Sequence, residues 1–182
     1  MNTQHFYKRI LVATDFSEPA EAALKQAVWL ARRTGGSVTL AHVLQTQYNP
    51  ATVEPDPKMD MLIDLWANEG ESPEDLEMAA RKDTDIQLRR LIGKIAGSID
   101  VQTKVYLGCS FAEIVYAVDK EGYDLVLVGT RGLAPWEEFL VGSTAKRLVR
   151  KCPSSVWIVK SEHVGQPKVV MAATDFSDVS LN

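Results

Sequence analysis

Three glycines and two hydroxyl residues in the last third of the chain have the types and spacing of a phosphate-binding site. Gly129 and Gly132 follow the apolar run 125–128, and Gly142–Thr144 stands where a helix is predicted to begin. A glycine lets the main chain approach a ligand closely because it has no Cβ. The first turn of a helix adds free N–H groups and the positive end of its dipole. These features suit a phosphate group, although the same glycines can serve only to turn the chain between a strand and a helix.

Composition argues against several other functions. The chain has 182 residues, 46% of them apolar, which is enough to bury one core. Its formal charge is −4 and it contains no long run of basic residues, which argues against binding to nucleic acid. No stretch approaches the ~20 apolar residues of a membrane-spanning helix, and residues 1–8 lack an apolar signal core. Cys109 and Cys152 form no C-x-x-C pair. We therefore expect a cytoplasmic protein that binds neither nucleic acid nor a membrane, and we assign no metal site.

The rest of the chain predicts strands that alternate with helices. Apolar runs typical of strands occupy residues 9–14, 37–43, 100–107, 125–128 and 155–159, and helical patterns occupy residues 18–34, 73–96, 111–120 and 143–151. The first strand, helix and strand span about 35 residues, which is typical of a βαβ unit with parallel strands. The sequence thus predicts an α/β domain with a doubly wound, open, parallel, five-stranded sheet of Rossmann-like type.

Residues 44–71 interrupt this alternation with a long connection that contains three prolines and Gly70. Within it, Met59, Leu62, Ile63 and Trp66 follow helical spacing, which predicts a short amphipathic helix. This helix either packs against its own domain or covers the ligand site or a partner surface.

The chain repeats its beginning near its end. Residues 168–177 match residues 8–17 at an offset of 160, and Ala-Thr-Asp-Phe-Ser is identical in both copies. We interpret the second copy as the first strand of a second unit. The predicted organisation is one domain at residues 1–161, a linker at 162–167 and a truncated second repeat at 168–182, as in the front half of a tandem protein.

The pattern Gly-x2-Gly-x9-Gly-Ser resembles the one that marks the ATP-binding branch of the universal stress protein family. The resemblance extends over residues 7–160, through the segments 12–17, 40–43 and 124–129. It implies a sheet of strand order 3-2-1-4-5, the fold of adenine nucleotide alpha hydrolases. In such sheets, ligands bind outside the carboxyl ends of the strands where the order reverses. Asp15 and Gly129 are expected to meet there.

The resemblance further implies that ATP, with or without Mg²⁺, binds at this reversal. Asp15 would accept hydrogen bonds from the ribose hydroxyls, or only cap the following helix. Val43 would meet adenine through its N–H and C=O, or serve packing alone, and Arg131 would add charge or stay solvated. His42 is interpreted as a strand histidine that is satisfied within the fold. The predicted nucleotide-binding residues are Ala13, Thr14, Asp15, Val43, Gly129, Arg131, Gly132, Gly142, Ser143 and Thr144.

The sequence gives no catalytic residue. It contains no Ser–His–acid set, G-x-S-x-G elbow or metal-ligand cluster, and a site of main-chain donors without a general base binds rather than reacts. We expect an ATP-binding, stress-responsive regulatory module with at most slow hydrolysis or autophosphorylation at Ser143 or Thr144. The alternatives are an interaction and dimerisation module without nucleotide, or a slow ATP hydrolase on the same fold. Glu137 and Glu138 would repel phosphate, share a Mg²⁺ ion with it, or face water.

The last strand, Ser155–Lys160, is expected at an edge of the sheet, and exposed edges tend to be paired or covered. The family resemblance implies that this strand pairs across two units. We therefore expect a homodimer through this strand.

Overall fold

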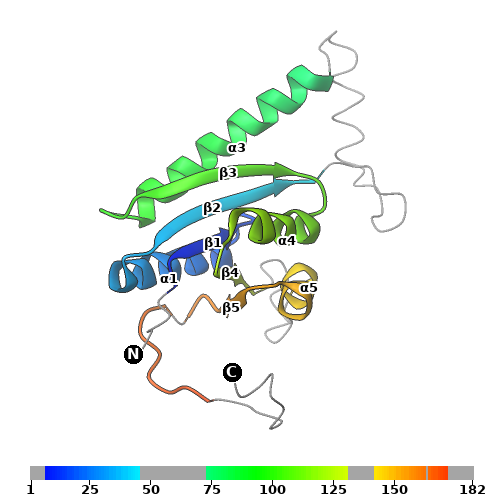
Figure 1. Cartoon of the computed structure of the whole chain (residues 1–182). Helices are drawn as coiled ribbons and strands as arrows, with labels where there is room; N and C mark the ends of the chain where they lie inside the picture. The colour runs from blue at the N-terminus through cyan, green and yellow to red at the C-terminus, as the bar shows by residue number, and fades with distance from the viewer. Residues whose placement is uncertain (1–6, 46–72, 131–141, 163, 172–182) are drawn as a thin grey trace.

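A computed structural model describes residues 7–45, 73–130, 142–162 and 164–171 of the chain. Figure 1 shows a sheet with helices on both of its faces. The strands are β1 (Arg9–Ala13), β2 (Ser37–Leu44), β3 (Val101–Leu107), β4 (Leu125–Gly129) and β5 (Ser155–Val159). The helices are α1 (Glu18–Thr34), α3 (Pro73–Ile95), α4 (Ser110–Glu121) and α5 (Ser143–Lys151).

The five strands are all parallel and lie in the order β3-β2-β1-β4-β5. The doubly wound fold class predicted from the sequence and the strand order implied by the resemblance are therefore confirmed. β1 is the central strand, and the order reverses between β1 and β4. At this reversal the chain leaves the two strands for opposite faces of the sheet, which opens a crevice at their carboxyl ends.

The central strands are buried on both faces, which explains why they are continuous apolar runs. Ile10 and Val12 belong to the core beneath α1 and α3, whereas Leu11 between them belongs to the core beneath α4 and α5. This alternation follows from the two-residue period of a strand. Leu125 and Leu127 on β4 share the face of Ile10 and Val12. The result is a three-layer arrangement of helices, sheet and helices (Figure 1).

Local signals set the ends of α1 as the sequence predicts. Ser17 is the N-cap, and its hydroxyl accepts a hydrogen bond from the Ala20 N–H at 3.4 Å. Pro19 lies in the first turn, where its missing N–H costs no helical hydrogen bond. Gly35 ends the helix with φ of 67°, a left-handed conformation that favours glycine. The other predicted bounds differ from the observed ones by one residue at most ends, as expected where helices and strands fray.

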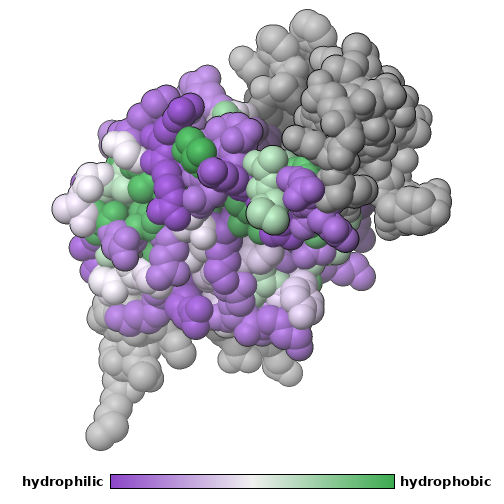
Figure 2. Space-filling model, turned by 90° about the horizontal axis from the view of Figure 1, so that it is seen from above, coloured by the Kyte–Doolittle hydropathy of each residue, from purple (hydrophilic) through white to green (hydrophobic). Residues whose placement is uncertain are grey.

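The edge strand β3 is protected by α3. The Arg81 guanidinium donates a hydrogen bond of 2.9 Å to the carbonyl oxygen of Val105, and the Thr103 hydroxyl donates one of 2.5 Å to Asp85. Ion pairs from Glu77 to Arg81 and from Asp85 to Arg89 run along the same helix. Figure 2, which looks down on the α3 side of the molecule, shows a mostly hydrophilic face with isolated hydrophobic side chains. A polar helix thus covers this edge of the sheet.

A polar cluster joins β3 to the end of α4. Glu121 accepts hydrogen bonds from the hydroxyls of Tyr106 (2.9 Å) and Tyr123 (3.0 Å) and forms an ion pair with Lys104. Burial raises the pKa of Glu121, but these three donors outweigh burial and hold the pKa below its ordinary value. Burial and the contact with Glu121 raise the pKa of Tyr106.

The chain after β5 returns to α1. Gln26 is fully buried, and its side-chain amide forms two hydrogen bonds with the main chain of Gly165: Nε2 donates to the carbonyl oxygen at 3.0 Å and Oε1 accepts from the N–H at 2.6 Å. The pair satisfies a buried amide that would otherwise be costly. The linker predicted at 162–167 is therefore attached to the first helix in this structure.

The described part of the C-terminal repeat forms no strand. Val170 and Met171 are 81% and 89% exposed, whereas Ile10 and Leu11, which occupy the same positions of the first copy, are fully buried. Residues 172–182 lie outside the described residues, so the second unit stays a prediction. The amphipathic helix predicted within residues 44–71 also lies outside them. None of the helices in the described parts of the chain is both long enough and apolar enough to span a bilayer.

Candidate functional site

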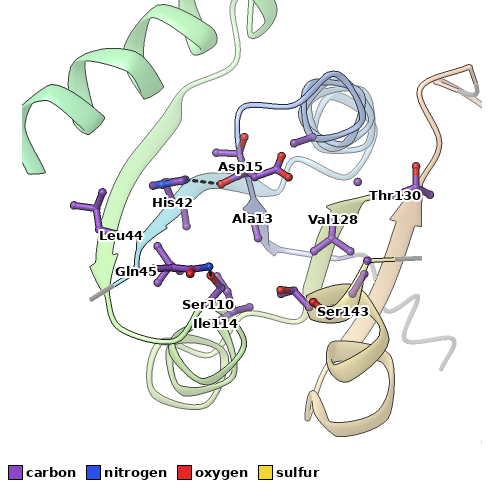
Figure 3. A pocket seen from close by; sticks show the side chains of 18 residues that line it. Ala13, Asp15, His42, Leu44, Gln45, Ser110, Ile114, Val128, Thr130 and Ser143 are labelled. Carbon is purple, nitrogen blue, oxygen red and sulfur yellow. Dashed lines mark hydrogen bonds between the residues drawn. The ribbon is translucent and has the colours of Figure 1, made fainter. Parts of the chain in front are cut away.

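A cavity of about 600 Å³ lies at the carboxyl ends of β1, β2 and β4 (Figure 3). Its size falls within the range of about 300–1,000 Å³ that ligand pockets occupy. The first turns of α1, α4 and α5 complete its walls. The lining residues are Ala13, Thr14, Asp15, Ala20, Ala41, His42, Val43, Leu44, Gln45, Ser110, Ile114, Val128, Gly129, Thr130, Gly142, Ser143, Thr144 and Ala145.

Most of the residues predicted to bind nucleotide line this cavity. The sheet brings Asp15, at the end of β1, to the same cavity as Gly129, at the end of β4, and Ser143, at the start of α5. Arg131 and Gly132 lie outside the described residues, so their contacts stay predictions. The other predicted residues that line the cavity are Ala13, Thr14, Val43, Gly142 and Thr144.

Asp15 uses one carboxylate oxygen to hold the turn between β1 and α1. Its Oδ1 accepts hydrogen bonds from the Ser17 N–H at 3.0 Å and from the Ser17 hydroxyl at 2.5 Å. Ser17 is itself the cap of α1. No described residue donates to the other oxygen, Oδ2, and the side chain is exposed at the cavity. Asp15 therefore contributes to the cap through Oδ1, and its Oδ2 has no donor among the described residues of the cavity.

The main chain of Val43 faces the space beyond the end of β1. The last main-chain bond between β1 and β2 runs from the Thr14 N–H to the Ala41 carbonyl at 2.9 Å, whereas the Leu44 carbonyl faces β3 and accepts from Gly108. Main-chain groups of a strand alternate between its two neighbours. The N–H and C=O of Val43 thus point to the side of β1, where that strand has ended. They are available as a donor and acceptor pair at the cavity.

The first turn of α5 provides the donors at the other end of the cavity. Gly142 is its N-cap and carries no side chain to bond the N–H groups of Ser143, Thr144 and Ala145, which have no partner within the helix. Arg150 and Lys151 lie in the last turn, so the helix has the charge distribution that matches its dipole. Among the described lining residues there is no lysine or arginine. An anion here would be held by N–H groups and hydroxyls.

Close packing against α1 requires a glycine at position 129, a reason that the local sequence does not reveal. A Cβ built on Gly129 would lie 2.5 Å from the carbonyl carbon of Pro19 and 2.6 Å from the nitrogen of Ala20. Both atoms belong to the main chain of the first turn of α1. The absence of a side chain therefore lets α1 pack closely on the end of β4, and the glycine is required whether or not a ligand approaches it.

The turn after β1 is strained and braced by His42. Phe16 has φ of 63° and is the only non-glycine residue with positive φ in the described parts of the chain. Such a conformation costs about 1 kcal/mol or more and persists only where neighbours hold it. The His42 ring lies 4.8 Å from the Phe16 ring, and its Nδ1 donates to the Thr14 carbonyl oxygen at 2.7 Å. His42 is thus satisfied within the fold, as the sequence reading expected.

Several lining residues are not among those predicted from the sequence, and Ser110 is the most informative of them. Ser110 begins α4 and presents its hydroxyl near Gln45, with which it shares a hydrogen bond of 3.5 Å. A signal was available, because a helix that follows a strand in a doubly wound sheet begins at the carboxyl edge. Ile114, one turn further along α4, and Val128 of β4 form an apolar wall that only packing reveals.

The described side chains contain no group of three His, Cys, Asp or Glu residues placed to hold a metal ion. Cys109 and Cys152 are both free, half-buried thiols. The groups at this cavity could accept hydrogen bonds at Asp15, form a donor and acceptor pair at the main chain of Val43, and donate to an anion at the first turn of α5.

Comparison with known proteins identifies the family of this chain. The model of the universal stress protein family matches residues 6–160, so the chain belongs to that family. A relative from Staphylococcus haemolyticus is 29% identical over 167 residues, which cover 90% of this chain and 92% of that protein. A universal stress protein from Methanocaldococcus jannaschii is 26% identical over 162 residues, 86% of this chain and 97% of its own length.

Solved structures share the fold. The structure of the Methanocaldococcus protein has a TM-score of 0.63 at 25% identity and covers 85% of this chain and 96% of its own. A universal stress protein from Archaeoglobus fulgidus in complex with dAMP has a TM-score of 0.54 at 22% identity, covering 85% and 99%. Another member, in complex with cAMP, has a TM-score of 0.51 at 22% identity, covering 85% and 98%. At these last identities the likeness concerns the fold.

Proposed function

We propose that this chain is a stress-responsive regulatory module that binds an adenine nucleotide, with ATP as the ligand, in the cavity at the carboxyl ends of β1, β2 and β4. The observation that carries the proposal is the convergence on one cavity of Asp15 Oδ2, the main chain of Val43 and the first turn of α5, of which the first two have no hydrogen-bond partner among the described residues. Family members in complex with cAMP and with dAMP support the class of ligand.

Each part of the nucleotide has a matching group. The Watson–Crick edge of adenine offers a donor beside an acceptor, which complements the N–H and C=O of Val43. Asp15 Oδ2 accepts from the ribose hydroxyls, since an ionised carboxylate only accepts hydrogen bonds. The phosphates reach the N–H groups and hydroxyls of Ser143 and Thr144, where the helix dipole favours negative charge. This order keeps the carboxylate away from the phosphates.

The binding test is calorimetric titration of the full chain with ATP, with and without Mg²⁺, beside Asp15→Asn. The substitution keeps the size of the side chain and removes its charge, and hydrogen bonds to charged groups contribute about 1.5–3 kcal/mol. We therefore expect ATP affinity to fall about 10- to 100-fold. Asp83→Asn is the matched control, because Asp83 is an exposed carboxylate on α3 and does not line the cavity. Wild-type protein that gives no binding heat with ATP contradicts the proposal.

We propose that occupancy by the nucleotide, and not its turnover, is the functional signal. Phosphate release from labelled ATP should stay near the uncatalysed background, with at most slow hydrolysis or autophosphorylation at Ser143 or Thr144. Sustained turnover would instead favour the slow ATP hydrolase.

The free thiols of Cys109 and Cys152 agree with the reducing cytoplasm expected from the sequence.

A homodimer through β5 is the second proposal, and the contrast between the two sheet edges favours it. α3 occupies the β3 edge through Arg81, whereas in the described parts of the chain no helix side chain bonds the main chain of β5. The Val159 carbonyl accepts from Thr130 on the β4 side, so the main chain of Val156 and Ile158 faces the open edge. An open edge readily pairs with a second strand.

Light scattering of Val156→Pro tests the dimer. Proline removes an outward-facing N–H at an edge position where the sheet tolerates it, so the variant should be monomeric while the wild-type protein is dimeric. Val156→Ala keeps the N–H and loses similar packing, and it should remain a dimer. Wild-type protein that is monomeric at high concentration contradicts the proposal.

A further inference from the structure

We propose that His42 is a positioning residue for the nucleotide site: its imidazole ends the pairing of β1 with β2, keeps the Val43 N–H free, and braces the turn that carries Asp15. This inference rests on the proposed function and adds to it a residue that lies outside the glycine and serine pattern. It concerns how the site is held open and shaped.

The first step is the direction of the hydrogen bond between His42 and Thr14. The His42 Nδ1 lies 2.7 Å from the Thr14 carbonyl oxygen, the contact drawn as a dashed line in Figure 3. A carbonyl oxygen only accepts, so Nδ1 carries the proton and donates it. Thr14 is 6% exposed, so water has little access to replace this donor. The imidazole of His42 therefore supplies the hydrogen bond that the carbonyl oxygen of buried Thr14 needs.

The hydrogen bond from His42 to Thr14 takes the place of the next main-chain bond between β1 and β2. In the parallel ladder, the Ala41 carbonyl accepts from the Thr14 N–H at 2.9 Å. The next bond of the same ladder would run from the Val43 N–H to the Thr14 carbonyl oxygen. His42 donates to that oxygen from its side chain, and among the described residues the Val43 N–H does not use the oxygen's second lone pair. The ladder ends one bond early, and the Val43 N–H remains directed at the cavity.

The third step is the turn itself. Phe16, with its positive φ of 63°, packs its ring 4.8 Å from the His42 ring at an angle of 39°. The Phe16 N–H donates to the Thr14 hydroxyl at 3.0 Å. His42 thus contacts the residues on both sides of Asp15 and limits the positions that the Asp15 carboxylate can take. The His42 side chain therefore helps to shape both the proposed adenine site at Val43 and the proposed ribose site at Asp15.

Two substitutions of His42 separate its donor from its ring. His42→Asn places an amide N–H near the position of Nδ1, so it keeps the bond to Thr14 and loses the contact with Phe16. His42→Phe keeps a ring and loses the donor. Calorimetric titration uses ATP and inorganic tripolyphosphate, which has the phosphates but neither base nor ribose.

We expect His42→Phe to weaken ATP binding by about 10-fold or more, as loss of oriented hydrogen bonds does. His42→Asn loses only the ring contact that braces the turn, so it should weaken ATP binding less, by about threefold. Tripolyphosphate affinity should be the same in all three proteins, because the first turn of α5 is untouched. A merely structural role would lower the affinity for both ligands together. Equal ATP affinity of His42→Phe and wild type, or equal losses in the two variants, would overturn the inference.

A measurement without ligand separates failure of this inference from failure of the proposed function. In wild-type protein, the amide proton of Val43 should exchange with solvent faster than that of Ala41, which pairs with β1. Equal protection of the two amides overturns the role of His42 even where ATP binds. Exchange at Val43 that is fast in wild type and slower in His42→Phe, in a protein that does not bind ATP, supports the role of His42 in the fold and overturns the nucleotide proposal alone.

Discussion

Replacing Gly129 with alanine tests why the end of β4 carries a glycine. The added Cβ would meet three main-chain atoms, the carbonyl carbon and oxygen of Pro19 at 2.5 and 2.7 Å and the nitrogen of Ala20 at 2.6 Å. Carbon atoms in ordinary contact are about 3.5–4.0 Å apart. The first turn of α1 or the end of β4 must therefore move by about 1 Å. Neither is the flexible end of a side chain, so the shift disturbs the packing of both elements.

Two opposing effects set the change in the free energy of unfolding of Gly129→Ala. Overpacking a well-packed site costs about 1–3 kcal/mol and sometimes more, whereas alanine in place of glycine restricts the unfolded chain and stabilises by about 0.4–1 kcal/mol. The difference between the two effects is a free energy of unfolding for Gly129→Ala about 1–2 kcal/mol lower than that of wild type. The midpoint of thermal unfolding should fall by about 2–8 °C for a chain of this size.

Urea titration followed by circular dichroism gives the comparison, with two other glycines as controls. Gly93 lies inside α3 with no atom within 4 Å of the added Cβ, so Gly93→Ala should stabilise by about 0.8–1 kcal/mol. Gly35 has equal space but φ of 67°, so Gly35→Ala should destabilise by about 1–2 kcal/mol through strain alone. A Gly129→Ala protein as stable as wild type would refute the packing argument.

The remaining predictions concern the core, the polar cluster and the linker. Leu88→Ala removes a fully buried side chain of α3 and should lower the free energy of unfolding by about 2–5 kcal/mol in urea titration. Glu121→Gln should destabilise by about 1–3 kcal/mol at pH 7. Because the folded pKa of Glu121 lies below its unfolded value, this difference should hold above pH about 4.5 and shrink as the pH falls further, as unfolding at a series of pH values would reveal. Gln26→Leu removes both hydrogen bonds to Gly165 and should make residues 160–168 easier to cut with trypsin, and unchanged cleavage would contradict that attachment.

The sequence by itself determined the local structure and much of the fold. Strand positions follow from the apolar runs, and the ends of α1 follow from the cap at Ser17 and the glycine at Gly35, because these signals depend on residues that are neighbours in the chain. The glycine and serine pattern pointed to the crevice at the strand ends. The resemblance that it carried supplied the strand order, which local patterns do not encode.

Only the tertiary structure decided what each site residue does. Gly129 packs against Pro19, Asp15 holds the cap of α1 through Oδ1 at the edge of the cavity, and His42 bonds the carbonyl oxygen of Thr14. Each of these facts depends on a partner that is distant in the sequence and close in space. Hydrogen bonds and steric contacts act over a few ångströms, so the identity of a residue's partners is fixed only when the sheet brings the segments together.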